Sequence, residues 1–472
     1  MIVAGTELRG SLERAGFDEE GIAAALGLDA PVGSNAAAAY LRRVPPSSPL
    51  TTALRLFLVG EAVPRAEAEQ LLRVDELVAE GIAELDGDRV VPLLGLKLWQ
   101  GILFAHDLHR SPLPADHVVG VHPATRTVAA MTLRRPVVRA LDLGTGCGSQ
   151  ALLAARHADS VVATDVNRRA LGLARLNARL NGLDNVELRE GSLFEPVAGE
   201  RFDLIVSNPP FVVSADSELV FRDAGYARDV LSRGVVDGLA DHLVDGGFAA
   251  TLVSWAHGSD EDWSRPVRDW IAGNGCDAIV VRYVCDDDVG YAVKWAEDDS
   301  VDRWLGYYRD NGIEHISTGA VVLRRRDGRG RRWVEALDAA TGPSTSASPQ
   351  LERTFAARDL LESKPDLMSE RLALAPHRLQ ESLAWTGEGY VPQHLALTLD
   401  DGMGVEGPVD PRALRTLFEL DGSRALRELP DVRAALPTIE RLLELGFVER
   451  VGDRGFEPRT SALSERRSNQ LS

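Results

Sequence analysis

Cysteines are few and widely spaced in this chain of 472 residues. Cys147, Cys276 and Cys285 match neither a metal-ligand spacing nor a disulfide framework. No apolar run reaches the length of about 18 residues that a membrane span needs, and the first residues lack the basic start and apolar run of a signal peptide. We therefore expect a cytoplasmic protein with no metal site and no membrane association.

Basic residues are scarce too: 52 lysines and arginines stand against 71 aspartates and glutamates, giving a formal net charge of −19. Such acidity disfavours non-specific binding to DNA or RNA, because contacts with phosphates need positive charge. One basic cluster, Arg324–Arg332, is either a site for phosphate or an acidic protein face, or the solvated tip of a hairpin. The acidic runs 286–288 and 297–299 indicate a solvated loop, since no histidine or ligand spacing accompanies them.

Glycine is common in this chain, and three glycines stand close together in one pattern. The segment Ala140-Leu-Asp-Leu-Gly-Thr-Gly-Cys-Gly148 predicts a buried strand that ends in a glycine-rich turn, followed by a helix from Ser149. Glycine permits positive φ and lets the backbone approach a ligand closely, and the helix N-terminus presents free N–H groups to it. Taken alone, the pattern is weak evidence for a ligand, because a tight strand-to-helix turn can also produce it.

Two later strand ends strengthen the functional interpretation. Val161–Asp165 is an apolar strand that ends in an acid, and a carboxylate there can accept both hydroxyls of a ribose. Phe202–Phe211 is a further apolar strand, and it ends in Asn-Pro-Pro-Phe. Because helices alternate with these strands, we expect an α/β fold with a doubly wound, mostly parallel sheet, and a ligand at its carboxyl edge.

Together these motifs resemble the class I S-adenosylmethionine (SAM) methyltransferases, in the Asn-Pro-Pro-Tyr/Phe subgroup that methylates planar nitrogens. The resemblance covers 118–326 and is strongest to HemK-type glutamine methyltransferases, then to small-domain ribosomal RNA guanine methyltransferases. It implies a seven-stranded Rossmann-like core whose last strand is antiparallel and lies between the fifth and sixth. It also implies SAM as cofactor. The implied cofactor residues are Gly144, Thr145, Gly146, Cys147 and Gly148 for the methionine and ribose, Asp165 for the ribose, Ser192 and Leu193 for the adenine, and Asn208 beside them.

The implied catalytic residues are Asn208, Pro209, Pro210 and Phe211. An acceptor nitrogen with a delocalised lone pair must be held so that the lone pair points at the methyl group. Asn208 Oδ1 and the Pro209 carbonyl can each accept one N–H of that amine and stabilise developing positive charge. The two prolines stiffen the loop, and Phe211 can stack on a planar amide or base.

Three functions are compatible with these residues. A protein or peptide amide of the glutamine type is favoured, because the motif set is most similar to the glutamine enzymes and the net charge disfavours nucleic acid. The exocyclic amine of an RNA or DNA base is the alternative, because phenylalanine replaces the tyrosine usual in the glutamine enzymes. A non-enzymatic regulator or adaptor is the third, and the intact Asp165 and Asn208 argue against it.

The domain organisation follows from composition and periodicity. We expect an N-terminal helical, winged-helix-like module at 1–100 with a hairpin turning at Asp86-Gly87, the methyltransferase domain at 101–339 and a linker at 340–350. A C-terminal winged-helix-like α+β module at 351–459 and a disordered tail at 460–472 complete the chain. The N-terminal module either recognises a macromolecular substrate or caps the catalytic domain.

Two histidines precede the glycine-rich turn, at His117 and His122. Each is either a general base or a turn histidine with a satisfied hydrogen bond. The second interpretation is favoured, because nothing else in the sequence pairs with them.

Overall fold

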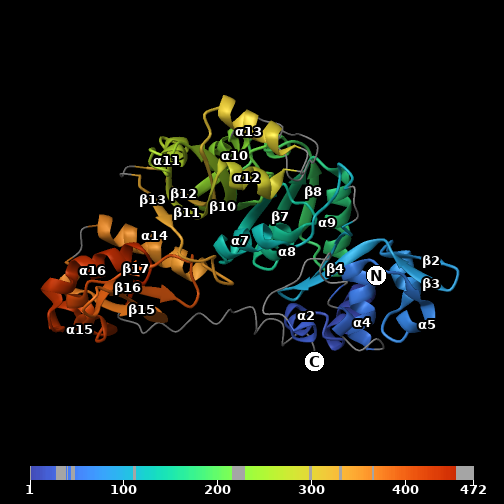
Figure 1. Cartoon of the computed structure of the whole chain (residues 1–472), viewed down its shortest axis with the longest axis horizontal. Helices are drawn as coiled ribbons and strands as arrows, with labels where there is room; N and C mark the ends of the chain where they lie inside the picture. The colour runs from blue at the N-terminus through green and yellow to red at the C-terminus, as the bar shows by residue number, and fades with distance from the viewer. Residues whose placement is uncertain are drawn as a thin grey trace. The chain divides into compact units, whose positions relative to one another are not determined.

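The computed structural model describes residues 2–27, 39, 41–43, 48–109, 113–214, 229–296, 300–328, 332–363 and 366–452 (Figure 1). The predicted tail at 460–472, the acidic run 297–299 and the tip of the basic cluster at 329–331 lie outside these residues. The chain forms two compact units, Met1–Asp338 and Ala339–Ser472. Within the described residues no helix has the length and apolar character to cross a membrane.

The first unit is built around an eight-stranded sheet in the order β13-β11-β12-β10-β9-β6-β7-β8. Its strands are β6 (Val137–Leu143), β7 (Ala158–Asp165), β8 (Val186–Glu190), β9 (Phe202–Ser207), β10 (Leu243–His257), β11 (Cys276–Asp287), β12 (His315–Arg325) and β13 (Val334–Asp338). β12 runs antiparallel to both β10 and β11, whereas the other pairings are parallel. The doubly wound fold is confirmed, with the antiparallel strand between the fifth and sixth, and β13 extends the sheet beyond the seven expected strands.

Helices connect these strands and bury their apolar faces against the sheet. They are α7 (Pro123–Met131), α8 (Ser149–Ala154), α9 (Arg168–Leu180), α10 (Val230–Asp241), α11 (Arg265–Ile271), α12 (Asp288–Trp295) and α13 (Val301–Asp310). The side chains of α10 and α11 form one buried cluster with those of the central strands. Burial on both faces explains why the central strands contain continuous runs of Val, Ile, Leu and Ala.

Within the first unit, the N-terminal segment packs against α9. Its helices are α1 (Ile2–Arg14), α2 (Glu19–Leu26), α4 (Pro49–Ala53), a π-helical turn at Leu54–Val59, α5 (Arg65–Ala68) and α6 (Val74–Ala79). The expected hairpin is present as β2 (Ala83–Asp86) and β3 (Arg89–Pro92), and β1 (Val63–Pro64) joins it as a third strand. β4 (Leu94–Trp99) and β5 (Ile102–Asp107) form a second hairpin. One cluster of buried residues joins these elements to α9.

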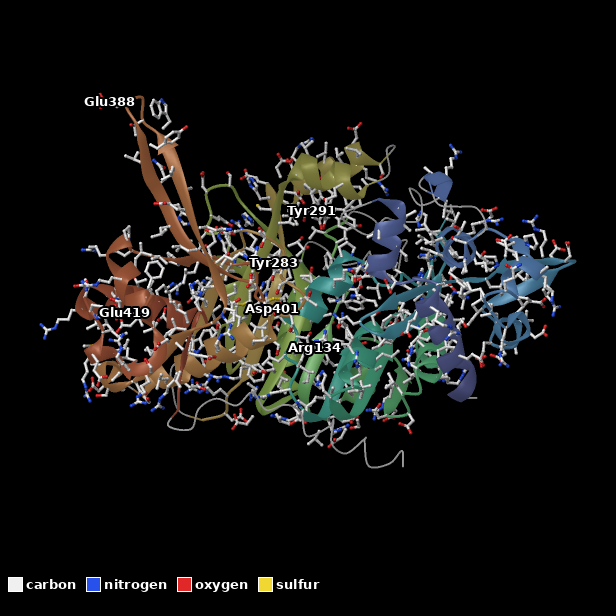
Figure 2. The ribbon with its side chains drawn as sticks, turned by 90° about the horizontal axis from the view of Figure 1, so that it is seen from below. Arg134, Tyr283, Tyr291, Glu388, Asp401 and Glu419 are labelled. Atoms are coloured by element: carbon white, nitrogen blue, oxygen red, sulfur yellow. The ribbon has the colours of Figure 1, made fainter. Side chains whose placement is uncertain are left out.

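The second unit contains two three-stranded sheets and the helices α14 (Ser348–Glu362), α15 (Leu414–Leu417) and α16 (Val432–Glu444). One sheet joins β14 (Arg371–Leu374), β18 (Asp421–Ala425) and β19 (Val448–Arg450). The other joins β15 (His377–Trp385), β16 (Tyr390–Leu399) and β17 (Gly407–Pro408), and Glu388 lies at the tip of its long hairpin (Figure 2).

The segment expected as a linker, 340–350, is ordered within this second unit. The Ala340 N–H donates to the Gly404 carbonyl at 2.9 Å, and the Ser344 N–H donates to the Gly402 carbonyl at 3.0 Å. From Ser348 the chain is helical as the start of α14. Its Ser, Thr and Pro composition therefore encodes a hydrogen-bonded turn region that leads into a helix.

Candidate active site

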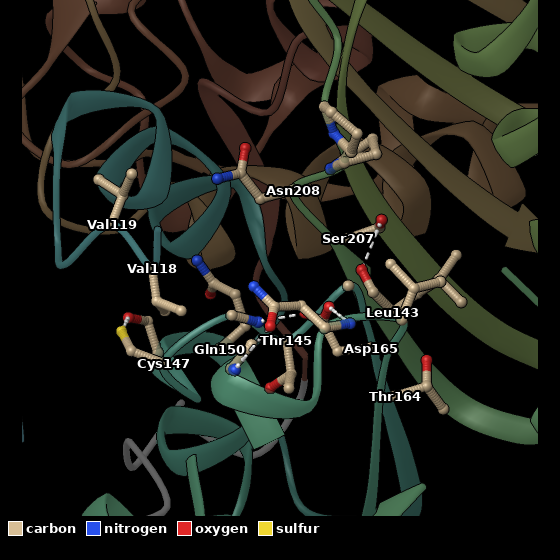
Figure 3. A pocket seen from close by; sticks show the side chains of 18 of the residues that line it. Val118, Val119, Leu143, Thr145, Cys147, Gln150, Thr164, Asp165, Ser207 and Asn208 are labelled. Atoms are coloured by element: carbon tan, nitrogen blue, oxygen red, sulfur yellow. Dashed lines mark hydrogen bonds between the residues drawn. The ribbon is translucent and has the colours of Figure 1, made fainter. Parts of the chain in front are cut away.

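A cavity of about 410 Å³ opens at the carboxyl ends of β6, β7 and β9, where Leu143, Asp165 and Ser207 line it (Figure 3). β6 is the strand at which the winding of the sheet reverses, and open α/β sheets bind ligands at this position. The predicted site residues that line the cavity are Gly144, Thr145, Gly146, Cys147, Asp165, Ser192, Leu193, Asn208, Pro209 and Pro210.

Backbone hydrogen bonds fix the glycine-rich turn to the end of β7. The N–H groups of Gly144 and Thr145 donate to the Thr164 carbonyl at 3.0 and 2.8 Å. Gly144 and Gly146 have φ of +75° and +56°, and a Cβ placed on either would meet no atom within 4 Å. The backbone conformation, together with open space above it, explains why glycine occupies these positions.

Gly148 differs from the other two glycines of the turn. It caps the N-terminus of α8 with φ of +91°, and a Cβ there would lie 2.9 Å from Leu152 Cδ1 and 3.3 Å from Ala174. It is not among the residues that line the cavity. The structure therefore places Gly148 in the packing of α8 against α9.

Asp165 ends β7 and has both carboxylate oxygens in use. Oδ2 accepts the N–H of Gly146 at 2.8 Å, and Oδ1 accepts the N–H of Asn167 at 2.8 Å. Burial raises the pKa of this carboxyl, and the backbone donors oppose that shift. Each oxygen still has a free lone pair for a ligand hydroxyl.

Ser192 and Leu193 follow β8 on the same side of the cavity. Leu193 has φ of +47°, a left-handed conformation that is uncommon for a branched residue. The preceding Gly191 donates its N–H to the carbonyl of Asp165 at 3.1 Å, which ties this turn to the end of β7. Residues held in such conformations are often found at ligand sites.

The Asn-Pro-Pro segment begins directly after β9, which fixes its first residue. Ser207 is fully buried, and its Oγ donates to the Leu143 carbonyl at 2.9 Å. The Oδ1 atom of Asn208 is buried and has no hydrogen-bond partner among the described residues. Figure 3 shows Asn208 at one side of the cavity and Thr145 and Asp165 at the other. An unpaired buried acceptor is costly, so this atom is suited to a ligand donor.

Phe211 takes a different position from the one expected for a stacking platform. It is partly buried and packs against the cluster formed by Val213, Tyr291 and Tyr308, among others. It is not among the residues that line the cavity. The physical reason is an apolar cluster on α12 and α13, which the ring contacts.

One wall of the cavity contains residues that are not among the predicted site residues. They include Val118, Val119, Thr125 and Gln150. Gln150 lies in the first turn of α8 and donates from Nε2 to the Thr125 carbonyl at 2.8 Å, which fixes α7 against α8. Its place directly after the glycine-rich turn is the sequence signal that could have identified it.

The two histidines also line this wall, and burial lowers the pKa of both. For His122 the pKa falls to about 4, because its ring is largely removed from water. His117 Nδ1 lies 3.9 Å from Asp107 Oδ2, and that carboxylate is itself paired with Arg169. The geometry therefore favours neutral rings that belong to the pocket wall.

Asp142 was not singled out and is the most strongly perturbed acid near the cavity. Its side chain is buried in β6, and burial raises its pKa to about 7. Oδ2 accepts from Thr145 Oγ1 at 2.6 Å and from the Ala151 N–H at 2.8 Å. Oδ1 has no partner among the described residues. Asp142 thus links the glycine-rich turn to α8.

The described part of the Arg324–Arg332 cluster is engaged in contacts within the chain. Arg324 and Arg326 pair with the buried carboxylate of Asp277 at 2.8 and 3.3 Å. Arg325 pairs with the carboxylate two residues later and donates to a carbonyl of α10. These arginines bind β11, β12 and α10 together at the far end of the sheet.

The acidic residues at 286–288 are likewise used locally. Asp286 pairs with Lys294 at 3.1 Å, and Asp287 caps α12 by accepting the Gly290 N–H. The run 286–288 is therefore not the expected solvated loop: it is the end of β11 and the start of α12.

Known proteins resemble this chain over its central part. A family model described as "Methyltransferase small domain" matches residues 121–233, and one described as "Domain of unknown function (DUF7059)" matches residues 14–93. The release factor glutamine methyltransferase of Yersinia pestis is 35% identical over 240 residues, which are 49% of this chain and 79% of that protein. Those of Xylella fastidiosa (strain Temecula1 / ATCC 700964) and Escherichia coli (strain K12) are 40% and 28% identical over 26% and 43% of this chain, respectively. The matched segment spans about half the length (48%) of the Xylella fastidiosa protein and 75% of the Escherichia coli protein.

Proposed function

Because this chain belongs to the same methyltransferase family as the release factor glutamine methyltransferases, we propose that it methylates a side-chain amide nitrogen of a protein, with SAM as the methyl donor. The observation that carries the proposal is Asn208, which lines the cavity at the switch point of the sheet and whose buried Oδ1 has no partner among the residues that the structure describes. A primary amide supplies the N–H that this oxygen lacks.

The residues on the other side of the cavity fit SAM. The open space above Gly144 and Gly146 admits a ligand close to the backbone, where a side chain would fill it. Asp165 has a free lone pair on each oxygen for the two ribose hydroxyls, and Ser192 and Leu193 lie beside it for the adenine. When bound, SAM supplies an electrophilic methyl group on its sulfonium.

The chain's own residues orient the acceptor. Asn208 Oδ1 accepts one N–H of the amide, and the Pro209 carbonyl accepts the other, so the nitrogen is held in one orientation. Both oxygens stabilise the positive charge that develops on the nitrogen as the new bond forms. Holding the reactants in this way can supply roughly 7–11 kcal/mol of the barrier, and the rings of Pro209 and Pro210 restrict the segment.

The relatives point to the class of acceptor. They are named for the glutamine of a release factor, and we propose a glutamine of a peptide-chain release factor as the acceptor here. A nucleic-acid base gains less support from the site, because Phe211 packs against α12 and α13 and the described arginines of the basic cluster pair within the chain.

The test is methyl transfer from radiolabelled SAM by the full chain to a purified release factor of the source cells. We expect label in one glutamine, located by mass spectrometry of a digest, and no label when that glutamine is replaced by alanine. Label in added total RNA but not in the release factor would overturn the amide acceptor. The absence of transfer to either, together with no SAM binding in calorimetry, would overturn the enzymatic function.

A further inference from the structure

The helices α12 and α13 connect the antiparallel strands β11 and β12, and they pack against the residues that follow the Asn-Pro-Pro segment. β11 and β12 stay paired up to Asp287 and His315, with one register shift between Arg282 and Val284, and the chain between them forms α12 and α13. Antiparallel neighbours can be joined by a turn of two residues, so the strand pairing does not require these helices. They need another physical explanation.

The two helices bury three large aromatic side chains toward the segment that follows Asn208. Tyr291 lies on α12, and Trp304 and Tyr308 lie on α13; each is at most 1% exposed. They form one cluster with Val212 and Val213, against which Phe211 packs. Figure 2 labels Tyr291 in this helical region.

The contact with Val213 is polar as well as apolar. The Val213 N–H donates to Tyr291 Oη at 3.2 Å, and Tyr308 Oη donates to the Val213 carbonyl at 2.8 Å. Val213 is buried, and a buried backbone group without a partner is strongly unfavourable. Two phenols from two helices therefore satisfy the backbone N–H and carbonyl of Val213, as a neighbouring strand does in a sheet.

Burial also keeps the Tyr291 phenol neutral, since it raises the pKa of that group to about 12. A neutral phenol can donate one hydrogen bond and accept another, so Tyr291 can accept from the Val213 N–H and still keep its own O–H as a donor at any working pH.

We propose that Tyr291 and Tyr308 are positioning residues that fix the segment from Asn208 to Val213 and thereby hold Asn208 Oδ1 toward the acceptor amide. The segment is held at its start by β9 and at its end by the two phenols, with the rigid Pro209–Pro210 between them. This proposal rests on the proposed function, because it assigns a role in orienting the acceptor of that same reaction.

The test compares Tyr308→Phe, Tyr291→Phe and the double variant with the wild-type full chain. Tyr307→Phe is the matched control, because it removes a phenol from α13, the helix of Tyr308, and leaves both of the Val213 bonds to Tyr291 and Tyr308 in place. We expect kcat to fall about tenfold in each single variant and further in the double variant, since loss of one hydrogen bond is worth up to about a factor of ten. The Kd for SAM and the KM for the protein acceptor should stay within about twofold, and Tyr307→Phe should behave as wild type.

Hydrogen exchange at the Val213 amide provides a readout that does not depend on activity. Tyr291→Phe removes the acceptor of that amide, so we expect faster exchange there while the amides of β9 exchange as in wild type. Unchanged kcat and unchanged exchange in folded variants would overturn the proposal. So would a parallel loss of kcat and SAM affinity, which indicates a merely structural role. If the wild type transfers no methyl group, the proposed function fails instead, and the exchange data still decide whether the two phenols hold this segment.

Discussion

The two sides of the cavity differ in how their polar atoms are satisfied. On one side, both oxygens of Asp165 accept backbone N–H groups, and the glycine-rich turn is tied to Thr164. On the other side, Oδ1 of Asn208 has no partner among the described residues, although it is buried. The first side is assembled by the chain itself, whereas on the second the described residues leave an acceptor open for a ligand donor.

This difference assigns separate tasks to the two sides. A preassembled side loses little conformational freedom on binding and so favours affinity for a constant ligand. An unsatisfied acceptor discriminates among ligands, because only one with a matching N–H group relieves its desolvation. We therefore expect changes on the Asp165 side to alter binding of SAM and changes on the Asn208 side to alter the rate of transfer.

The largest effect should come from Asn208→Ala. It removes the acceptor that orients the amide and stabilises its developing charge, so we expect kcat to fall about 100-fold to 1,000-fold. The Kd for SAM, measured by calorimetry, should change by less than about threefold, because the other expected cofactor contacts, at the glycine-rich turn and Asp165, are on the other side. Asn208→Asp keeps an oxygen at this position and is the matched comparison. A large loss of SAM affinity in Asn208→Ala would abolish the distinction between the two sides.

Asp165→Asn should show the converse pattern. It removes the charge and one of two acceptor oxygens, so either a ribose hydroxyl or a backbone N–H of the turn loses its partner. A hydrogen bond to a charged group is worth about 1.5–3 kcal/mol, so we expect the Kd for SAM to rise about tenfold to a hundredfold. At saturating SAM, kcat should remain within about threefold of wild type. A fall in kcat with an unchanged Kd would contradict this assignment.

The sequence predicts the residues that stand at strand ends on both sides of the cavity. The glycine-rich turn, the acid at the end of β7 and the asparagine at the end of β9 are found together, because the carboxyl ends of parallel strands meet at one edge of a sheet. Each of these residues sits directly at a strand end, so a local pattern is sufficient to place it.

The position of Phe211 could not be predicted in the same way, because it depends on α12 and α13, which follow it by about 80 residues in the chain. The raised pKa of Asp142 depends on how completely its carboxyl is buried in the folded chain, which the apolar pattern of the strand does not specify. β15 was missed for another reason: most of its side chains are exposed, so it lacks the alternation of apolar and polar residues that identifies a half-buried strand.

A smaller effect is expected at Asp142. Unlike Asp165, this residue should affect the stability of the folded chain, because it holds the glycine-rich turn to α8. Its pKa is about 7 in the folded chain against an ordinary value of 3.8, so the folded state binds more protons than the unfolded state between these values. Stability from this group is therefore full below about pH 4 and decreases by at most about 1.4 kcal/mol per pH unit as the pH rises toward 7.

Asp142→Asn cannot ionise and keeps an oxygen for Thr145 and Ala151. We expect its thermal unfolding midpoint, relative to wild type, to rise as the pH is raised from about 5 to 8. Asp159→Asn, at an exposed position of β7, is the control for loss of one carboxylate. Parallel pH profiles for Asp142→Asn and wild type would show that Asp142 does not retain its proton in the folded chain.

The smallest effect is expected for His122, which lines the cavity but is assigned to neither task. Burial lowers its pKa to about 4, so its charge does not change between about pH 6 and 8. His122→Asn should therefore leave the shape of the profile of kcat against pH as in wild type, because the acceptor amide is oriented by oxygens and sheds its proton after transfer. Loss of a limb of that profile in His122→Asn would instead identify the histidine as a general base. The Asn208 side would then require a proton acceptor in addition to its orienting oxygens.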